Sequence, residues 1–241
     1  MADTREAQDI FWVEPRRRGI LPLDGFHMPS SMLKLLKQER FAHTCDTNFE
    51  GVIAACAEPA PGREQSWINP IIQDAYVQLH REGHAHSIET WTADGMLAGG
   101  LYGVRLGSAF FGESMFSRET GASKAALAHL VVRLRAGGFQ LLDTQFLTPH
   151  LAGFGGTEVR RSQYVSLLKD ALERSADWKA LDVYVAGVGG ASGASGAGDA
   201  SDGGVAGLAR RGFADGLEAP AAATAFGPSG KLIVQLLSQT S

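Results

Sequence analysis

Apolar residues recur along the chain at two periods, and the longer period predicts helices. Five segments favour a helix: Met32–Glu39, Thr47–Ala57, Pro70–Glu82, Ser123–Arg135 and Ser162–Arg174. In the third of them Ile72, Tyr76 and Leu79 fall on one face, as expected of an amphipathic helix. Gly83 follows that segment and Gly137 follows the fourth, at positions where glycine commonly ends a helix.

Shorter apolar segments punctuated by glycine predict strands. They are Phe41–Cys45, His86–Trp91, Leu97–Leu106, Ala109–Phe116 and Phe139–Phe146. Asp94-Gly95, a dipeptide typical of tight turns, joins the second segment to the third and indicates an antiparallel meander. Lys231–Leu237 is a further apolar run with a Val/Ile centre, and we expect it to add an edge strand.

The order of these elements predicts an α+β chain with two parts and a tail. We expect a small mixed N-terminal domain over residues 1–62 and a larger domain over residues 63–178. The larger part runs helix, three strands, helix, strand, helix, an order that resembles N-acetyltransferases. A GNAT-like domain with a central, mostly antiparallel sheet flanked by helices follows by analogy. Residues 179–230, which include the Gly/Ala/Ser-rich stretch Ala186–Gly207, are expected to be a flexible linker before the tail, residues 231–241.

Composition restricts the class of protein. The 241 residues are 44% hydrophobic and 20% charged, which suits a soluble globular protein. There is no apolar run of the length of about 18 residues that predicts a membrane span, and Met1–Asp9 is polar where a signal peptide would be apolar. We therefore expect a cytoplasmic protein without membrane contact. Cys45 and Cys56 are the only cysteines, and their spacing suggests neither a zinc site nor a disulfide framework.

The net charge of −4 does not by itself favour an RNA partner, because phosphate binding depends on Lys and Arg. Three local basic clusters could still supply it: Arg16–Arg18, the set Lys34, Lys37 and Arg40, and Arg160-Arg161. Taken alone, each cluster is more typical of a solvated surface.

Two predicted strands carry the residues with the most chemical interest. Gly112–Arg118 (GESMFSR) places Glu113 among bulky apolar neighbours, where a carboxylate rarely lies without a partner. In Leu141–Phe146 (LLDTQF) the alternation of a strand puts Asp143 and Gln145 on the same face. We expect an acid and an amide to point into one site.

These motifs, taken with four further segments, resemble those of the leucyl/phenylalanyl-tRNA–protein transferase family, in that family's order. The further segments are Ser66–Ile68, His84–Trp91, Gly99–Val104 and His150–Gly156. The resemblance extends over roughly Phe11–Leu172. It implies transfer of Leu, Phe or Met from aminoacyl-tRNA to proteins that begin with Arg or Lys, with no cofactor and no metal. We expect a monomer that binds Leu-, Phe- and Met-tRNA.

The same resemblance implies roles for individual residues. Asp143 and Gln145 would sit at the reaction centre, with Asp143 orienting Gln145. Glu113 would lie beside them and attract a cationic N-terminal residue. Leu101, Met115, Leu130 and Leu142 would form the apolar pocket for the donor amino acid. Trp67 would stack on the terminal adenine, and Trp91 is the second candidate for this role.

Other interpretations of these residues remain open. Met115, Leu130 and Leu142 could be ordinary core, and Asp143 a structural acid. The spacing of His80, His84 and His86 could hold a metal, although no Cys or acid cluster accompanies it.

Two other functions compete with aminoacyl transfer. An acyl-CoA-dependent N-acetyltransferase would need a pyrophosphate loop, which Arg118–Ala122 (RETGA) matches only in part. An aminoacyl-tRNA-binding protein without turnover is the other, because family members carry a Gly-x-Phe-Pro segment ahead of the part matched by Phe11–Pro15. Either the protein starts upstream of Met1, or its N-terminal region is shortened and gives weaker support to the adenosine site.

Overall fold

The computed structural model describes residues 1–241 except 3, 6, 8, 61–63, 192–226 and 240–241. At its centre is a seven-stranded sheet in the order β2-β3-β4-β5-β6-β1-β7. Neighbouring strands are antiparallel, except that β5 and β6 are parallel. The strands are β1 (Arg17–Ile20), β2 (Ala42–Cys45), β3 (Ala85–Trp91), β4 (Leu97–Leu106), β5 (Ala109–Ser117), β6 (Leu141–Gln145) and β7 (Thr157–Arg160).

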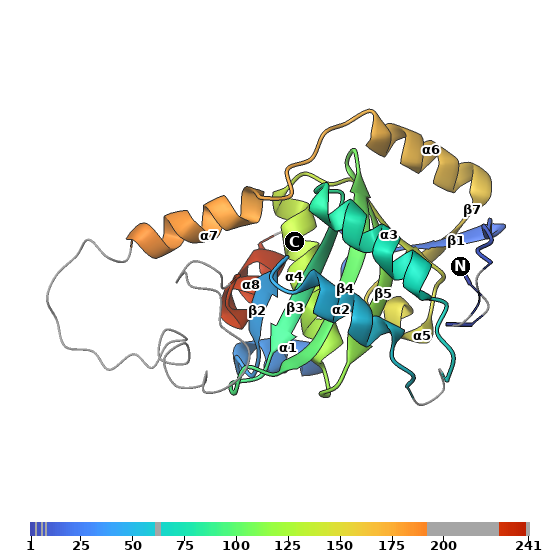
Figure 1. The fold of residues 1–241 in the computed structure, drawn as a ribbon. Coiled ribbons are helices and arrows are strands. Elements are labelled where there is room, and N and C mark those ends of the chain that lie inside the picture. Colours follow the sequence, from blue (N-terminus) through green and yellow to red (C-terminus); the bar gives the residue numbers. More distant parts are fainter. Residues whose placement is uncertain (3, 6, 8, 61–63, 192–226, 240–241) are drawn as a thin grey trace, which may run out of the picture.

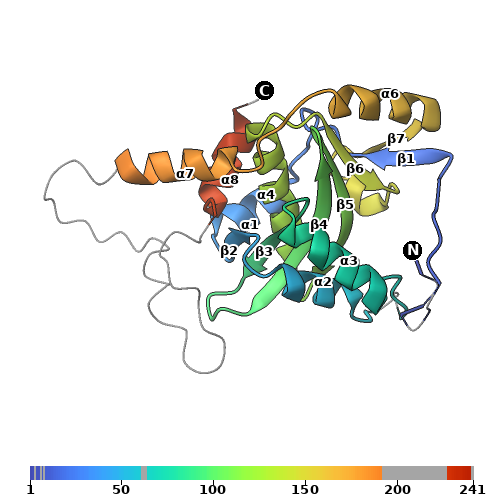
Figure 2. The same cartoon turned by 45° about the horizontal axis from the view of Figure 1, so that its top comes forward.

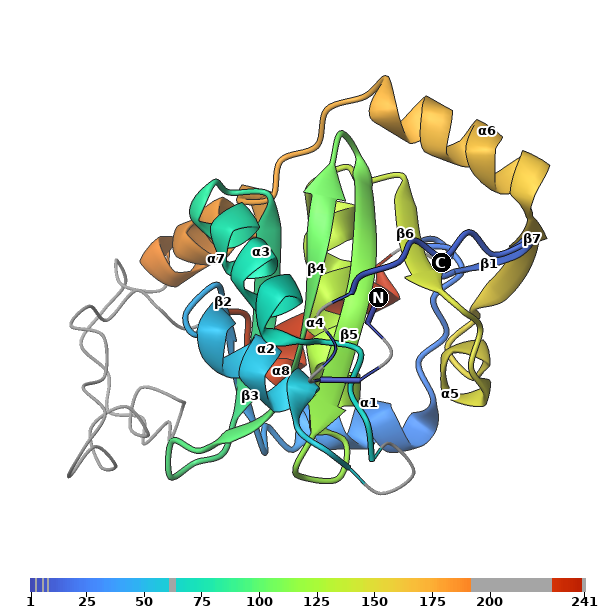
Figure 3. The ribbon, with the colours of Figure 1, turned by 45° about the vertical axis from the view of Figure 1, so that its right-hand side comes forward.

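Helices cover both faces of this sheet. α2 (Phe49–Ala57) and α3 (Pro70–Arg81) lie on one face, and α4 (Ala122–Ala136) lies on the other (Figure 1). Figure 2 shows α8 (Gly230–Ser238) beside α1 (Ser30–Lys37), and both pack against α4. Figure 3 shows α6 (Arg161–Leu172) at the end of the sheet formed by β6, β1 and β7. The remaining helices are α5 (Pro149–Ala152) and α7 (Ala180–Ala191).

Packing on both sides explains why α4 is buried along nearly its whole length. Its residues from Ala125 to Leu134 are all buried, including His129 and Arg133. A helix that faced only the sheet would leave one side to water. In this fold α1 and α8 cover that side, so α4 becomes the centre of the main hydrophobic core.

The predicted secondary structure is largely confirmed. All five expected helices and all five expected strands of the first 178 residues are present, with ends shifted by at most two residues. The α+β class and a mostly antiparallel sheet flanked by helices are also confirmed. Strands β1 and β7 were not predicted, because each is only four residues long and carries arginine or glutamate in place of a hydrophobic alternation.

Two expectations for the tail are wrong. Lys231–Leu237 is not an edge strand but part of α8, whose first turn is capped by the Ser229 side chain and which buries Ile233 and Val234. The expected linker does not begin at residue 179, because Ala180–Ala191 forms α7. Most of the remaining stretch, residues 192–226, lies outside the described residues.

The division near Arg63 stays a prediction. Strands from both sides of it join the same sheet: β1 pairs with β6 and β7, and β2 pairs with β3. Within the described part of the chain, none of the helices combines the length and the apolar character required to span a membrane.

Candidate active site

The predicted catalytic residues lie where strands β5 and β6 stop pairing. The two strands pair over only three positions, Ala109–Phe111 with Leu141–Asp143. Just beyond these pairs, Gln145 Nε2 donates a hydrogen bond of 2.6 Å to Glu113 Oε2. Both side chains are partly buried. The amide therefore bridges two strands whose backbones have separated.

Glu113 occupies an irregular position in β5. Tyr102 of β4 pairs with Ser114 and Gly103 pairs with Gly112, so Glu113 is the extra residue of a β-bulge. Gly103 is required here, because a Cβ at this position would overlap the Phe111 carbonyl and the Phe110 ring. Bulges redirect side chains, and this one turns Glu113 toward Gln145 and α3.

Gln145 has an uncommon backbone conformation. Its φ is +63°, and the Phe146 N–H donates to the Thr144 carbonyl at 2.7 Å across it. A hydrogen bond between residues two apart around a positive φ is the pattern of the rarer γ-turn, which is strained for a residue other than glycine. Gly19 of β1 pairs with Gln145, and a Cβ on Gly19 would lie 2.6 Å from the Phe146 carbonyl carbon. This end of β6 is thus bent and tightly packed.

Asp143 is fully buried and accepts hydrogen bonds from three residues. Arg18 Nε lies 3.1 Å and 2.9 Å from its two carboxylate oxygens, and Arg18 Nη2 lies 2.9 Å from Oδ2. The Tyr164 hydroxyl donates to Oδ2 at 2.5 Å, and the Gln145 backbone N–H donates to Oδ1 at 2.7 Å. Burial and the Asp143 carboxylate raise the pKa of Tyr164, which keeps this hydroxyl a donor.

Glu113 is partly buried, which disfavours its charged form. Burial raises the pKa of its carboxyl above the ordinary value, and the nearby Asp143 carboxylate raises it further. Hydrogen bonds with Gln145 and with Tyr76 of α3 oppose this shift. Burial raises the pKa of Tyr76, and the Glu113 carboxylate raises it further. These bonds form one connected network, the site network, made of Arg18, Tyr76, Glu113, Asp143, Gln145 and Tyr164.

The structure brings the three predicted catalytic residues together but adds three that sequence reasoning missed. Tyr76 was assigned only to an apolar helix face, and Tyr164 was not singled out. Arg18 was placed in a basic surface cluster, whereas its side chain pairs with Asp143. The only sequence indication was that a buried Asp143 needs a cation, and many arginines could have supplied it.

The four predicted pocket residues all belong to the main core or pack against it, on the α4 side of the sheet. Leu101, Leu130 and Leu142 are buried in the main core, and Met115, which pairs with Leu101 across the strands, packs against that core. Glu113 instead hydrogen-bonds with α3 on the opposite side. Leu142 precedes Asp143 in β6 and Met115 lies two residues after Glu113 in β5, so the apolar set and the site network share these two strands.

The two candidate tryptophans lie in different surroundings. Trp67 is partly exposed and packs against the core cluster around α2 and α3. Trp91 sits at the end of β3 and donates from Nε1 to Thr44 Oγ1 at 2.7 Å. Tyr76, which bonds with Glu113, packs against the same core cluster as Trp67.

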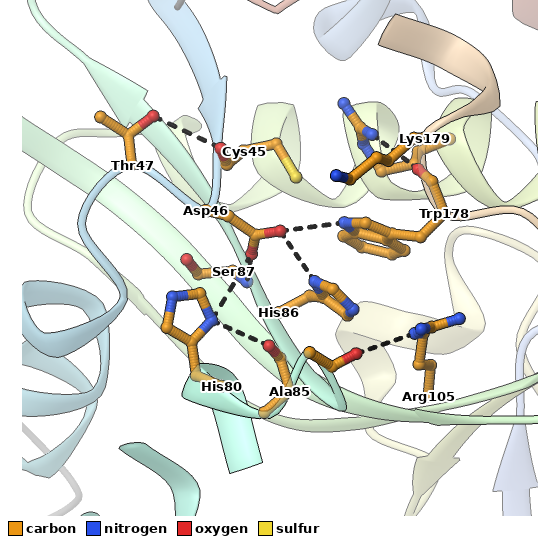
Figure 4. Close-up of polar contacts among 12 residues, drawn as sticks. Cys45, Asp46, Thr47, His80, Ala85, His86, Ser87, Arg105, Trp178 and Lys179 are labelled. Atoms are coloured by element: carbon orange, nitrogen blue, oxygen red, sulfur yellow. Dashed lines mark hydrogen bonds and ion pairs between the residues drawn. The ribbon is translucent and has the colours of Figure 1, made fainter. Parts of the chain in front are cut away.

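A second buried polar group lies at the other end of the sheet, around strands β2 and β3 (Figure 4). Asp46 accepts hydrogen bonds from His86 Nδ1 at 2.7 Å, from Trp178 Nε1 at 3.0 Å and from the Ser87 backbone N–H at 2.8 Å. These contacts hold the pKa of Asp46 below its ordinary value although burial opposes the shift.

The fully buried carboxyl of Glu89 belongs to the same region. It accepts 2.5 Å hydrogen bonds from the hydroxyls of Thr44 and Ser87. Burial raises its pKa. We call Asp46, His86, Trp178, Ser87, Thr44 and Glu89 the edge cluster.

Two of the three histidines considered as a metal site, His80 and His86, approach the same carboxylate, that of Asp46, with Nδ1 at 4.0 Å and 2.7 Å. His86 is bound to Asp46, while His80 Nδ1 hydrogen-bonds with the Ala85 carbonyl at 2.9 Å. Among the described residues, three or more His, Cys, Asp or Glu side chains are nowhere grouped so as to hold a metal ion.

Comparison with known proteins gives a consistent family. Residues 20–169 match the family model described as leucyl/phenylalanyl-tRNA protein transferase. A protein of Rhizorhabdus wittichii with the name leucyl/phenylalanyl-tRNA--protein transferase is 54% identical over 245 residues, covering 100% of this chain and 92% of its own. The proteins of the same name from Zymomonas mobilis and Nitrobacter winogradskyi are 53% and 54% identical over 76% and 75% of this chain, covering 70% and 80% of their own.

The first alignment covers the chain from end to end, so the segment after residue 178 is shared with that relative. The family model spans all the strands after β1 and every member of the site network except Arg18. By this match and by the identity of its relatives, the chain belongs to the leucyl/phenylalanyl-tRNA–protein transferase family.

Proposed function

We propose that this chain transfers Leu, Phe or Met from aminoacyl-tRNA to the N-terminal Arg or Lys of acceptor proteins, and so marks them for degradation by the N-degron pathway. The observation that carries the proposal is the Gln145 amide, fixed between two acids: its side chain bonds to Glu113 and its backbone N–H to Asp143. The family of the chain supplies the reaction to which this geometry belongs.

The transfer reaction depends more on orienting the acceptor amine than on activating the aminoacyl ester. The α-amine of the acceptor attacks the ester carbonyl of aminoacyl-tRNA, a peptide bond forms, and the tRNA ribose hydroxyl leaves. Because the ester is already an activated acyl donor, placing the amine and stabilising the developing oxyanion account for most of the task.

The residues divide this task between them. With one N–H of Gln145 given to Glu113, its amide oxygen can accept a hydrogen bond from the attacking amine. Glu113 supplies a partly buried negative charge that complements an N-terminal Arg or Lys.

For the donor side, we assign the side-chain pocket to Leu101, Met115, Leu130 and Leu142. Three of these are sealed in the core, so the donor side chain would enter beside the partly exposed Met115, where β5 and β6 part. An apolar site of this kind discriminates among Leu, Met and Phe only weakly, since one methylene is worth about 1–3 kcal/mol. Trp67 would stack on the terminal adenine.

Phosphate contacts are assigned to the exposed basic side of α1. Lys34 and Lys37 lie near its C-terminus and make no ion pair within the described residues, whereas Arg40 pairs with Glu119 at 3.5 Å. Free lysines can neutralise backbone phosphates despite the negative overall charge. A single chain supplies every group in this proposal, without a cofactor, and we propose that it acts as a monomer in the cytoplasm. The GNAT-like fold and the two-part division are part of the same proposal.

The alternative of an acyl-CoA-dependent N-acetyltransferase has less support. The loop that would hold a pyrophosphate is occupied by internal contacts: Arg118 pairs with Glu58 at 2.9 Å, and the Ser123 N–H at the start of α4 donates to Ser117 Oγ at 3.2 Å. A protein that binds aminoacyl-tRNA without turnover remains the other candidate.

The decisive experiment measures transfer of labelled leucine from Leu-tRNA to peptides that begin with Arg or with Asp. We expect transfer to the Arg peptide, inhibition by puromycin, and no inhibition by coenzyme A. Binding of Leu-tRNA without transfer would instead indicate the inactive protein. Glu113→Gln should reduce the preference for the Arg peptide, and an unchanged rate and preference would remove Glu113 from the acceptor site.

A further inference from the structure

We infer that Arg18 and Tyr164 are positioning residues for the transfer reaction: together they fix Asp143, which in turn holds Gln145 in its strained turn. This inference rests on the proposed function. It assigns a role in catalysis to two side chains from distant parts of the chain, one on β1 and one on α6.

The contacts leave Asp143 little freedom. Arg18 engages both carboxylate oxygens through Nε and Nη2, at 2.9–3.1 Å, and Tyr164 adds a 2.5 Å bond to Oδ2. The guanidinium also lies over the Tyr164 ring, 5.3 Å from its centroid. A planar guanidinium that binds both oxygens fixes the orientation of a carboxylate, which a point charge does not.

The orientation of Asp143 matters because its carboxylate also binds the backbone of Gln145. Oδ1 accepts the Gln145 backbone N–H at 2.7 Å, inside the turn in which Gln145 has φ +63°. A glutamine is disfavoured in this region of backbone space and stays there only if its surroundings compensate. Asp143 supplies that compensation from two residues away.

Release of the turn would misdirect the amide. If Gln145 left this turn, the direction of its Cα–Cβ bond would change, and the 2.6 Å bond between its side chain and Glu113 would be lost. The hydrogen bonds of Arg18 and Tyr164 therefore control the direction of the Gln145 amide without touching either substrate.

Tyr164→Phe is the sharpest single test, because it removes one hydroxyl and keeps the ring that packs against β1 and β6. We expect kcat for leucine transfer to fall about tenfold, the size of one lost hydrogen bond to a charged group, with KM for Leu-tRNA unchanged. Arg18→Lys, which keeps the charge but loses the planar fork, should lower kcat at least as much.

Two matched substitutions serve as controls. Tyr184→Phe removes the hydroxyl of an exposed tyrosine on α7, and Arg81→Lys alters an exposed ion pair with Glu50. Both should leave kcat and KM unchanged. A fall in kcat for Tyr184→Phe equal to that of Tyr164→Phe would overturn the specific role of Tyr164.

A double-mutant cycle with Gln145→Asn, measured in single turnovers with excess enzyme, decides whether the effect passes through Gln145. If it does, adding Tyr164→Phe to Gln145→Asn causes little further loss. A second tenfold loss, or full kcat in Tyr164→Phe alone, would overturn the inference and leave the proposed site intact. Wild-type transfer by Gln145→Asn itself would overturn the proposed site as well.

Discussion

The sheet carries two acid networks, one around β5, β6 and β1 and one around β2 and β3, and they are similar in composition. The site network contains Glu113 and Asp143, and the edge cluster contains Glu89 and Asp46. In each network, burial raises the pKa of the glutamate. In each, the aspartate accepts hydrogen bonds from several donors, one of which is a backbone N–H. By composition and burial alone, either network could be taken for a catalytic centre.

Their backbones distinguish them. Thr44 pairs directly with Glu89 in a regular register, and the two hydroxyls that bind Glu89 come from within the paired strands β2 and β3. Glu113 lies in a bulge and Gln145 in a strained turn, at the point where their strands separate. Asp46 also has a positive φ, +56°, but aspartate tolerates that conformation far better than glutamine.

The networks also differ in access. Glu89 is completely buried, whereas Glu113 and Gln145 are each partly exposed. A completely buried carboxylate in a regularly paired strand, such as that of Glu89, can stabilise the fold but cannot meet a substrate. The comparison therefore predicts that substitutions in the site network change transfer, and that matching substitutions in the edge cluster change stability.

The largest effect is expected from Gln145→Asn. Asparagine is better suited than glutamine to a positive φ, so the fold should be retained, while the shorter side chain cannot reach Glu113. We expect kcat to fall by about 100-fold or more, as for loss of one positioned polar group. Gln140→Asn, at an exposed position, is the control. A kcat within threefold of wild type would contradict the assignment of Gln145.

Asp46→Asn tests the edge cluster in the same way. It removes the charge that His86 and Trp178 bind, and we expect the free energy of unfolding to fall by about 2 kcal/mol with kcat unchanged. Because the folded-state pKa of Asp46 is lowered, its contribution is present above the ordinary pKa and is lost as pH falls through the folded-state value. The thermal midpoints of wild type and variant should therefore converge on acidification. A loss of transfer without a loss of stability would make the edge cluster functional.

The two buried glutamates should respond alike in stability and differently in activity. Each has a raised pKa in the folded state, so the folded protein binds the proton more tightly and loses stability as pH rises above the ordinary value of 4.5. Glu113→Gln and Glu89→Gln remove that loss, and each should raise the free energy of unfolding at neutral pH by about 1 kcal/mol. The gain should vanish below the ordinary pKa. Thermal unfolding across this pH range measures it, and only Glu113→Gln should also reduce transfer.

How much of this could be predicted from sequence depends on the range of the interactions. The segments Gly112–Arg118 and Leu141–Phe146 indicated which two strands carry the acids and the amide, because a strand pattern is local. The contact between Arg18 and Asp143 joins residues 125 positions apart, and no local pattern indicates it. The turn at Gln145 was equally hidden, since a glutamine at positive φ contradicts its own preference and depends on tertiary contacts.

The tail shows a different limit. A short apolar run such as Lys231–Leu237 fits a strand or a helix equally well by hydrophobicity, and burial against α1 and α4 decided for the helix. Ser229 before that run, a good N-cap residue, was the available clue. Ala180–Ala191 contains three glycines and was therefore assigned to the linker, although it forms a helix.

The smallest predicted difference concerns the two candidate tryptophans, Trp67 and Trp91. Trp67→Phe keeps an aromatic ring but reduces the surface available for stacking on adenine, so KM for Leu-tRNA should rise about threefold, a fraction of the ~1–3 kcal/mol of a full stacking contact. Trp91→Phe loses the hydrogen bond to Thr44, the residue that also binds Glu89, and should lower the thermal midpoint while leaving KM unchanged. Steady-state kinetics with Leu-tRNA measures KM for both variants, and thermal unfolding measures their midpoints. If Trp91→Phe raised KM and Trp67→Phe did not, adenine would bind at the β2 end of the sheet, and the separation of a catalytic end from a structural end would fail.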